Sequence, residues 1–395
     1  MRRMGSAALI VLLYLLVTSK AAGSSLNLQR VSPTAGFTYL DKKLYRTADN
    51  GQHWNEITPP YSPSSEISSA FFLNATVGWV VVSTYDDPAD TNRFMIESTT
   101  DAGAHWLAAS LRSDLVPAGI SLGSYTSVSF VDRRHGWLSI ELVSSAAAHF
   151  GIFLTSTDGG QTWTRVHNGP GTAGDVRFGS LLDGWIVSPE GDELTATHDG
   201  GNTWEKTELI APGHANENAT YELPTLTNAR SGYLAVKYSG LEAETLVIFK
   251  TQDGGRTWNP IDSIDGQDEG SSYMAAFQSG VLLTRVSQGK ATVTAVSPAG
   301  TAEGAKTVDL ATIGDVTRLE AVSYADPRHV WILAYAPACT AENVCVYLLS
   351  SEDGGASWRD ITPLEVRKVR ELSLPSGVTV KTRVLKGPPG RPEPF

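Results

Sequence analysis

Long apolar runs are nearly absent from this sequence. The single candidate, residues 7–17, is too short to cross a bilayer comfortably, and no other stretch approaches membrane length. It follows Arg2 and Arg3 and ends in small residues, which is the pattern of a secretory signal peptide. We therefore expect residues 1–23 to be a signal peptide that directs export to the periplasm or the cell exterior. No integral membrane segment is expected in the mature chain.

Cysteine is equally scarce, because the 395 residues contain only Cys339 and Cys345. Strand-like runs at 330–335 and 346–349 flank the pair. In an exported protein two such cysteines are usually oxidised, so the sequence predicts a disulfide that closes a hairpin loop. Two free thiols are the alternative. A metal site is not expected here, since no histidine lies nearby.

The sequence also lacks an excess of basic residues. Lys and Arg number 31 against 42 Asp and Glu, which gives a formal net charge of −11. A general surface for nucleic acid or for anionic membranes needs the opposite balance. The compact basic groups at 133–134 and 368–370 are explained by ordinary solvated charge. No nucleic-acid partner is expected.

Catalytic and metal-binding motifs are missing as well. The sequence contains no nucleophile elbow, phosphate loop or zinc motif. Carboxylates gather at 85–90 and again after residue 261, without the spacing of a calcium loop: Asp262, Asp265, Asp268 and Glu269. Solvated acidic loops are the simpler interpretation, so neither a cofactor nor a metal is expected.

What the sequence does contain is a unit repeated six times, Ser/Thr-x-Asp-x-Gly-x-x-Trp. β-Rich residues flank the copies, which predicts a strand, a tight turn and a second strand. The Asp can accept N–H groups of its own turn, the Gly suits a positive φ, and the Trp buries a large ring. Six dispersed copies indicate a structural role, because an enzyme needs its carboxylates at one site. The members are Asp49, Asp101, Asp158, Asp199, Asp253 and Asp353, with Trp54, Trp106, Trp163, Trp204, Trp258 and Trp358.

The spacing of the repeat predicts seven units. Successive aspartates at 49, 101, 158, 199, 253 and 353 differ by 52, 57, 41, 54 and 100 residues. The last gap spans about two periods, so one copy has been lost, and the hairpin around 297–300 is the expected site. A second mark, an aromatic at a strand start, precedes most copies by about twenty residues: Trp79, Trp137, Trp185, Tyr233 and Trp331.

The repeat resembles the Asp-box, or bacterial neuraminidase repeat, of sialidases, xyloglucanases, sortilin-type receptors and photosystem II assembly-factor-like proteins. All of these are β-propellers. The resemblance implies an all-β fold, a single seven-bladed β-propeller over residues 24–385. Only about twenty residues lie between the expected signal peptide and Thr47, enough for two strands. Strand-like segments at 371–374 and 378–384 are therefore expected to complete the first blade, before a disordered tail at 386–395.

By length and rhythm the sequence is most similar to the photosystem II stability/assembly-factor-like group. This likeness implies an exported, monomeric, non-catalytic propeller that binds a protein partner, although this chain lacks the basic patch of the photosynthetic members. The alternative is a carbohydrate-active propeller, either a lectin or a sialidase-like or xyloglucanase-like hydrolase. The sialidase Arg-Ile-Pro motif is absent, with 30–33 the nearest match, and xyloglucanases normally carry two propellers. Two carboxylates about 5–10 Å apart at the channel mouth would favour the hydrolase.

Overall fold

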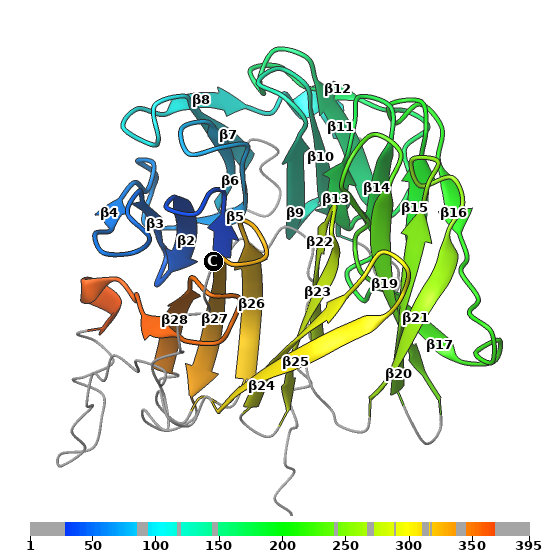
Figure 1. Ribbon diagram of the computed structural model, residues 1–395. Coiled ribbons are helices and arrows are strands. Elements are labelled where there is room, and N and C mark those ends of the chain that lie inside the picture. Colours follow the sequence, from blue (N-terminus) through cyan, green and yellow to red (C-terminus); the bar gives the residue numbers. More distant parts are fainter. Residues whose placement is uncertain are drawn as a thin grey trace, which may run out of the picture.

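The computed structural model describes residues 28–84, 94–116, 120–143, 149–240, 244–266, 272–287, 290–309, 316, 318–336 and 345–367. Within these ranges seven antiparallel sheets follow one another in chain order around a ring (Figure 1). The remaining regular structure is a 3₁₀ turn, η1 (Ser113–Leu115), and a helical turn at 364–367. The predicted all-β, seven-bladed β-propeller is confirmed. No helix among the described residues is long and apolar enough to cross a membrane.

The first three blades carry four strands each, in chain order. Blade 1 consists of β1 (Leu28–Arg30), β2 (Gly36–Leu40), β3 (Lys43–Thr47) and β4 (Asn55–Glu56). Blade 2 consists of β5 (Ser65–Phe72), β6 (Gly78–Thr84), β7 (Phe94–Thr99) and β8 (Leu107–Ser110). Blade 3 consists of β9 (Leu122–Phe130), β10 (Gly136–Leu142), β11 (Gly151–Ser156) and β12 (Thr164–Arg165).

The other four blades follow the same order. Blade 4 consists of β13 (Asp175–Phe178), β14 (Gly184–Val187), β15 (Leu194–Thr197) and β16 (Glu205–Thr207). In blade 5 two short strands, β17 (Asn218–Tyr221) and β18 (Thr225–Leu226), both pair with β19 (Gly232–Ser239), followed by β20 (Glu244–Thr251) and β21 (Asn259–Gly266). Blade 6 consists of β22 (Ser272–Phe277), β23 (Gly280–Ser287), β24 (Lys290–Val296) and β25 (Ala302–Asp309). Blade 7 consists of β26 (Arg318–Tyr324), β27 (Val330–Ala336), β28 (Cys345–Ser351) and β29 (Arg359–Asp360).

The antiparallel order gives the ring two different faces. The first strands of neighbouring blades contact one another, as β5 does with β9 and β9 with β13, so they line the axis. The chain enters each first strand on one side, which we call the entry face, and the connections from second to third strands lie there too. The first-to-second and third-to-fourth turns lie on the opposite side. All six repeat turns belong to this second side, which we call the box face.

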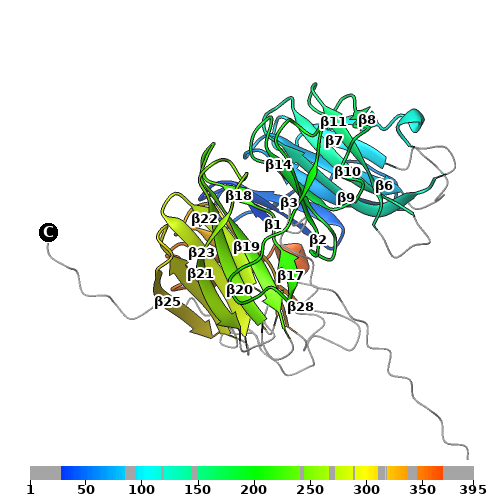
Figure 2. The ribbon, with the colours of Figure 1, turned by 90° about the vertical axis from the view of Figure 1, so that its right-hand side faces the viewer.

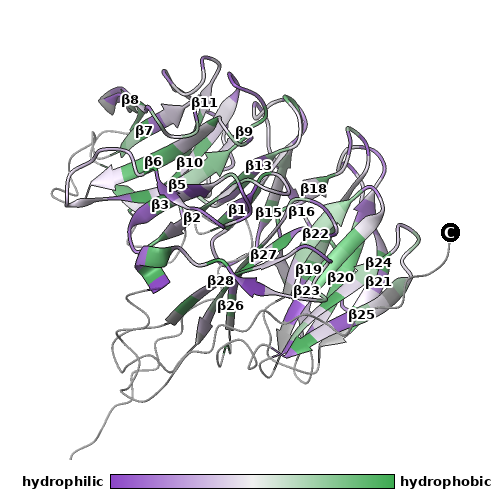
Figure 3. Ribbon diagram, turned by 60° about the vertical axis from the view of Figure 1, so that its left-hand side comes forward, coloured by the Kyte–Doolittle hydropathy of each residue, from purple (hydrophilic) through white to green (hydrophobic). Residues whose placement is uncertain are grey.

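Apolar side chains pack between the blades. The colouring of Figure 3 shows hydrophobic residues in many of the strands, β20 among them. Trp79 on β6 stacks on Phe130 of β9, with ring centroids 3.6 Å apart, and its Nε1 donates to the Gly159 carbonyl at 2.8 Å. Trp137 repeats the stacking on Phe178 at 3.5 Å in the next interface. Each ring thus contributes both buried area and a hydrogen bond to the neighbouring blade, which explains the recurring aromatic at the second strand.

The first blade corrects one expectation. All four of its strands come from residues 28–56, so its four-stranded sheet does not need the segments at 371–374 and 378–384 that were expected to complete it. The second strand begins at Gly36, where phenylalanine follows the glycine in place of tryptophan, and the first strand has only three residues. Three strands therefore fit before the first repeat turn. Residues 368–395 lie outside the described part of the chain.

Contacts between blades 1 and 7 close the ring, and these two blades lie side by side in Figure 1. The Arg30 backbone N–H of β1 donates to Ser323 Oγ of β26 at 2.8 Å. Trp331 Nε1 of β27 donates to Asn50 Oδ1 at 2.9 Å, and Trp54 Nε1 donates to the Ile361 carbonyl at 2.6 Å. Figure 2 shows blades 2 and 3 across the ring from blades 5 and 6.

Blade 6 is the blade without a repeat turn, as the spacing predicted. Its third and fourth strands are joined at 297–301, where the Ser297 N–H donates to the Thr301 carbonyl at 2.9 Å. Gly300 has φ +82° there, and a Cβ would lie 2.0 Å from the Ile261 carbonyl oxygen. This close approach to blade 5 leaves glycine as the residue that fits.

Candidate functional site

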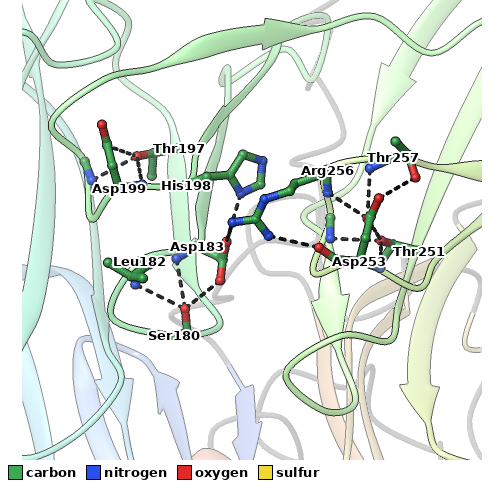
Figure 4. Close-up of polar contacts among 12 residues, drawn as sticks. Ser180, Leu182, Asp183, Thr197, His198, Asp199, Thr251, Asp253, Arg256 and Thr257 are labelled. Carbon is green, nitrogen blue, oxygen red and sulfur yellow. Dashed lines mark hydrogen bonds and ion pairs between the residues drawn. The ribbon is translucent and has the colours of Figure 1, made fainter.

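The repeat turns use their aspartates within the turn itself, as the turn at 251–257 shows (Figure 4). Asp253 Oδ1 accepts hydrogen bonds from Thr251 Oγ1 at 2.8 Å and from the Thr257 N–H at 2.9 Å. Asp253 Oδ2 accepts the Thr257 hydroxyl at 2.6 Å, and these bonds lower the pKa of Asp253. The Gly255 N–H donates to Thr251 Oγ1 at 2.9 Å, and its φ of +89° is unfavourable for other residues.

The other five turns repeat this arrangement. In all six, the first Ser or Thr hydroxyl donates to Asp Oδ1 at 2.8–3.0 Å. A hydrogen bond from the His105 N–H is the main reason that the pKa of Asp101 falls to about 2. The indole N–H also bonds locally in three turns, where Trp163, Trp204 and Trp358 donate to the carbonyl of the box Gly at 3.0–3.1 Å.

The six aspartates thus occupy six blades and do not meet at one place. Other candidates fall partly outside the described residues. Residues 85–90, Cys339, Asp268 and Glu269 are not described, nor are the side chains of Asp265 and Cys345. The acidic loops and the disulfide therefore stay predictions. Among the residues that the structure describes, no group of three His, Cys, Asp or Glu is placed to hold a metal ion.

A polar cluster on the entry face, which the sequence did not indicate, joins blades 3 and 4. His149 lies between two carboxylates, with Nδ1 2.8 Å from Glu141 Oε1 and Nε2 2.5 Å from Glu190 Oε1. The hydrogen bond to Glu141, with Glu190 adding to it, raises the pKa of His149. Gly123 makes room for this cluster, because a Cβ there would lie 2.5 Å from Glu141 Oε2. The Ala173 N–H holds the His149 carbonyl at 2.7 Å.

Nearer the axis, the same two blades are joined by a phenol and a carboxylate. Tyr125 Oη of β9 donates to Asp175 Oδ1 of β13 at 2.5 Å. Burial is the main reason that the pKa of Tyr125 is raised, and the nearby carboxylates raise it further. Two residues along β13, Arg177 donates to Thr225 Oγ1 at 2.8 Å, and burial raises the pKa of Glu222 to about 8. The carboxylates Glu141, Glu190 and Asp175 are therefore all hydrogen-bonded within the protein.

Large apolar side chains are exposed beside this cluster. Ile120, Val143 and Phe150 have 40%, 59% and 49% of their surface in solvent. The backbone brings them together, since the Val143 N–H donates to the Ser121 carbonyl at 2.8 Å and the Leu142 N–H to the Phe150 carbonyl at 2.7 Å. We call these three side chains the blade-3 entry patch. Phe150 directly follows His149, so the patch borders the polar cluster.

Comparison with known proteins agrees with the fold. The family model for the BNR/Asp-box repeat matches residues 154–165, and no curated protein matches the chain. A GH74 xyloglucanase from Xanthomonas campestris is 13% identical, with a TM-score of 0.54 over 88% of this chain and 55% of the enzyme. A prolyl endopeptidase is likewise 13% identical, with a TM-score of 0.54 over 87% of this chain and 49% of that one. YCF48 bound to D1 peptide is 20% identical, with a TM-score of 0.47 over 79% of this chain and 89% of YCF48.

The xyloglucanase and the prolyl endopeptidase share the fold of this chain with very little sequence identity. The chain is a seven-bladed β-propeller, and the turns that recur in six of its blades are Asp-box repeats. The xyloglucanase and the prolyl endopeptidase are enzymes of different classes, so the likeness shows the fold and does not assign a function.

Proposed function

We propose that this chain is an exported, non-catalytic propeller that binds a protein partner through the blade-3 entry patch. The observation that carries the proposal is the exposure of three large apolar side chains on entry-face segments whose backbones are hydrogen-bonded to one another. Side chains that folding leaves in water gain free energy when a partner covers them, about 25 cal/mol per Å² of apolar surface. Export rests on the signal-like residues 1–23.

The polar cluster beside the patch supports binding over hydrolysis. A glycosidase needs one carboxyl group free to protonate the leaving group and a second free to act as base or nucleophile. Here Glu141 and Glu190 share one imidazole, and Asp175 accepts the Tyr125 phenol. These contacts fit groups that hold blades 3 and 4 together and shape the border of a binding surface.

Site-specific photocrosslinking tests this proposal. A benzophenone side chain replaces Val143 in one variant and Leu107 in the other, a matched control that is 57% exposed on β8. We expect one partner from the exported fraction to be captured at 143 and not at 107, and Phe150→Asp to abolish the capture. Equal capture at both positions would contradict the proposal. So would turnover of aryl-glycosides that Glu190→Gln abolishes with the fold intact, which would favour the carbohydrate-active alternative.

A further inference from the structure

The turn between the first and second strands can be compared directly between blades. In the six blades with an Asp box, one carbonyl of this turn accepts an N–H from the box at 2.7–2.9 Å. That contact identifies the equivalent position in each blade. It is occupied by Thr34, Thr76, Arg134, Arg230 and Arg328 in blades 1, 2, 3, 5 and 7, and by Leu182 in blade 4. Blade 4 alone of these six has an apolar residue there.

Polar side chains at this position stabilise the turn. Arg134 Nε donates to the Thr157 carbonyl at 3.2 Å, and Arg230 Nε donates to the Gln252 carbonyl at 3.3 Å. A leucine cannot make either bond. Because the turn of blade 4 is nevertheless ordered by other groups, the leucine side chain is not needed to hold it.

Those other groups are visible in Figure 4. Ser180 Oγ donates to Asp183 Oδ2 at 2.8 Å within the turn. His198 Nδ1, from the box of blade 4, lies 2.9 Å from Asp183 Oδ1, and Arg256 Nη2, from the box of blade 5, lies 3.4 Å from the same oxygen. Asp183 therefore links two boxes, and the hydrogen bonds that hold the turn involve the backbone of Leu182 but not its side chain.

The two leucines of this turn are left in water. Leu181 is 49% exposed and Leu182 is 55% exposed. Among the described residues, no other turn on the box face carries an exposed large apolar side chain. Leu182 stands where the equivalent blades have polar residues, and Leu181 stands where four of the five have proline or alanine. Two adjacent exposed leucines are costly to keep in solvent and gain free energy when covered.

Charge indicates what covers them. Exposed arginines stand on the neighbouring turns of the same face, Arg133 and Arg134 in blade 3 and Arg230 in blade 5, whereas Arg256 is already paired with Asp183. The aspartates of these boxes are engaged by their own turns. A guanidinium binds a carboxylate with two parallel hydrogen bonds, so arginines beside an apolar turn suit a segment that combines apolar and acidic side chains. The chain's net charge of −11 opposes such a partner at long range, so recognition must come from these short-range contacts.

We infer that the Leu181–Leu182 turn is a docking surface for a protein segment in which apolar side chains alternate with carboxylates. It lies on the opposite face from the blade-3 entry patch, so it is a second site, and it stands whether or not the entry patch binds a partner.

The repeat itself supplies the variant for the test. Leu181→Ala combined with Leu182→Thr gives blade 4 the Ala-Thr pair that blade 2 has at residues 75–76, so the fold is expected to tolerate it without added charge. The matched control is Leu107→Thr, a leucine of similar exposure on β8. The probes are three labelled decapeptides, measured by fluorescence anisotropy: leucine with glutamate, serine with glutamate, and leucine with lysine.

We expect wild-type protein to bind the leucine–glutamate peptide at least about tenfold more tightly than the other two. The double variant should weaken this binding about tenfold or more, while Leu107→Thr and the entry-patch change Val143→Asp leave it unaltered. Arg133→Gln should weaken it separately. Equal affinity for all three peptides, no binding of the leucine–glutamate peptide, or the same loss in Leu107→Thr would overturn the inference.

Discussion

Asn50 is the residue on which closure of the ring depends most directly. It is buried, and its Oδ1 accepts hydrogen bonds from Trp331 Nε1 and Ser350 Oγ, both at 2.9 Å, and from Arg30 Nη2 at 3.0 Å. Its Nδ2 donates to Glu352 Oε1. One side-chain amide oxygen of blade 1 therefore accepts three hydrogen bonds, and two of the donors belong to blade 7. Asn50→Gly would remove this amide from the junction.

Glycine suits this position, because Asn50 has φ +55° and four other boxes have glycine at the equivalent place. The substitution therefore adds no strain and isolates the loss of the amide. Trp331 is fully buried and Ser350 nearly so, and each buried donor left without an acceptor costs about 1–3 kcal/mol. Arg30 keeps the Pro33 carbonyl and adds little. We expect a loss of about 3 kcal/mol in the free energy of unfolding.

Urea denaturation followed by tryptophan fluorescence measures this loss, and the melting temperature should fall by about 4 °C for a chain of this size. Ala102→Gly is the control, since Ala102 has φ +68° at the same position of the second box. Ala102→Gly should change the free energy of unfolding by no more than about 1 kcal/mol, because two effects oppose each other. Glycine relieves the strain of a positive φ in the folded state, but it also gives the unfolded chain more conformational freedom. If Asn50→Gly and Ala102→Gly shift stability equally, the reasoning on ring closure is wrong.

Three further predictions concern other contacts. The pKa of His149 is raised in the folded state by Glu141, so its stabilising contribution is complete below the unfolded pKa of about 6.5 and is lost as pH rises through the higher folded pKa. The stability difference between wild type and His149→Gln in urea titrations should therefore shrink as pH rises above about 6.5. Trp137→Phe keeps the stacking but loses the bond to the Gly200 carbonyl and should cost about 1 kcal/mol, against about 3–5 for Trp137→Ala, in the same assay. The pKa values of the box aspartates are lowered, so their contribution is present above about pH 4 and should be lost towards pH 2, which thermal melts across that range would detect.

The sequence predicted the ring because the Asp box is a local structure. Within a box the interacting groups lie two to four residues apart, as Ser156 Oγ and Asp158 Oδ1 do, so six copies and their spacing were enough to count seven blades. The first blade was predicted wrongly because Phe37 replaces the usual tryptophan and the strand before it has only three residues. A strand of three residues, and a second strand that lacks the expected tryptophan, do not show the pattern by which strands are recognised in a sequence.

The entry-face cluster could not be predicted in this way. His149 meets Glu141 within blade 3, but it meets Glu190, 41 residues away, only because blades 3 and 4 are adjacent. Asn50 and Trp331 are 281 residues apart and meet because the ring closes. Spacing along the chain carries no information on such pairs, since the position of one blade against the next is decided by packing of whole sheets.

In a repeat protein, the positions where one unit departs from the others separate structural needs from functional ones. Asn50 departs from the glycine of four other boxes, and its hydrogen bonds to blade 7 account for the change completely. Leu182 departs from the polar residue of the other turns, and nothing inside blade 4 requires it, because Asp183 and His198 hold the turn and the leucine is half exposed. A departure that the fold does not need, and that exposes apolar surface, is best explained by a contact outside the chain. The same reasoning predicts that Leu182→Thr alone leaves the stability of the propeller unchanged within about 0.5 kcal/mol, and a larger loss in urea denaturation would assign the leucine to the fold.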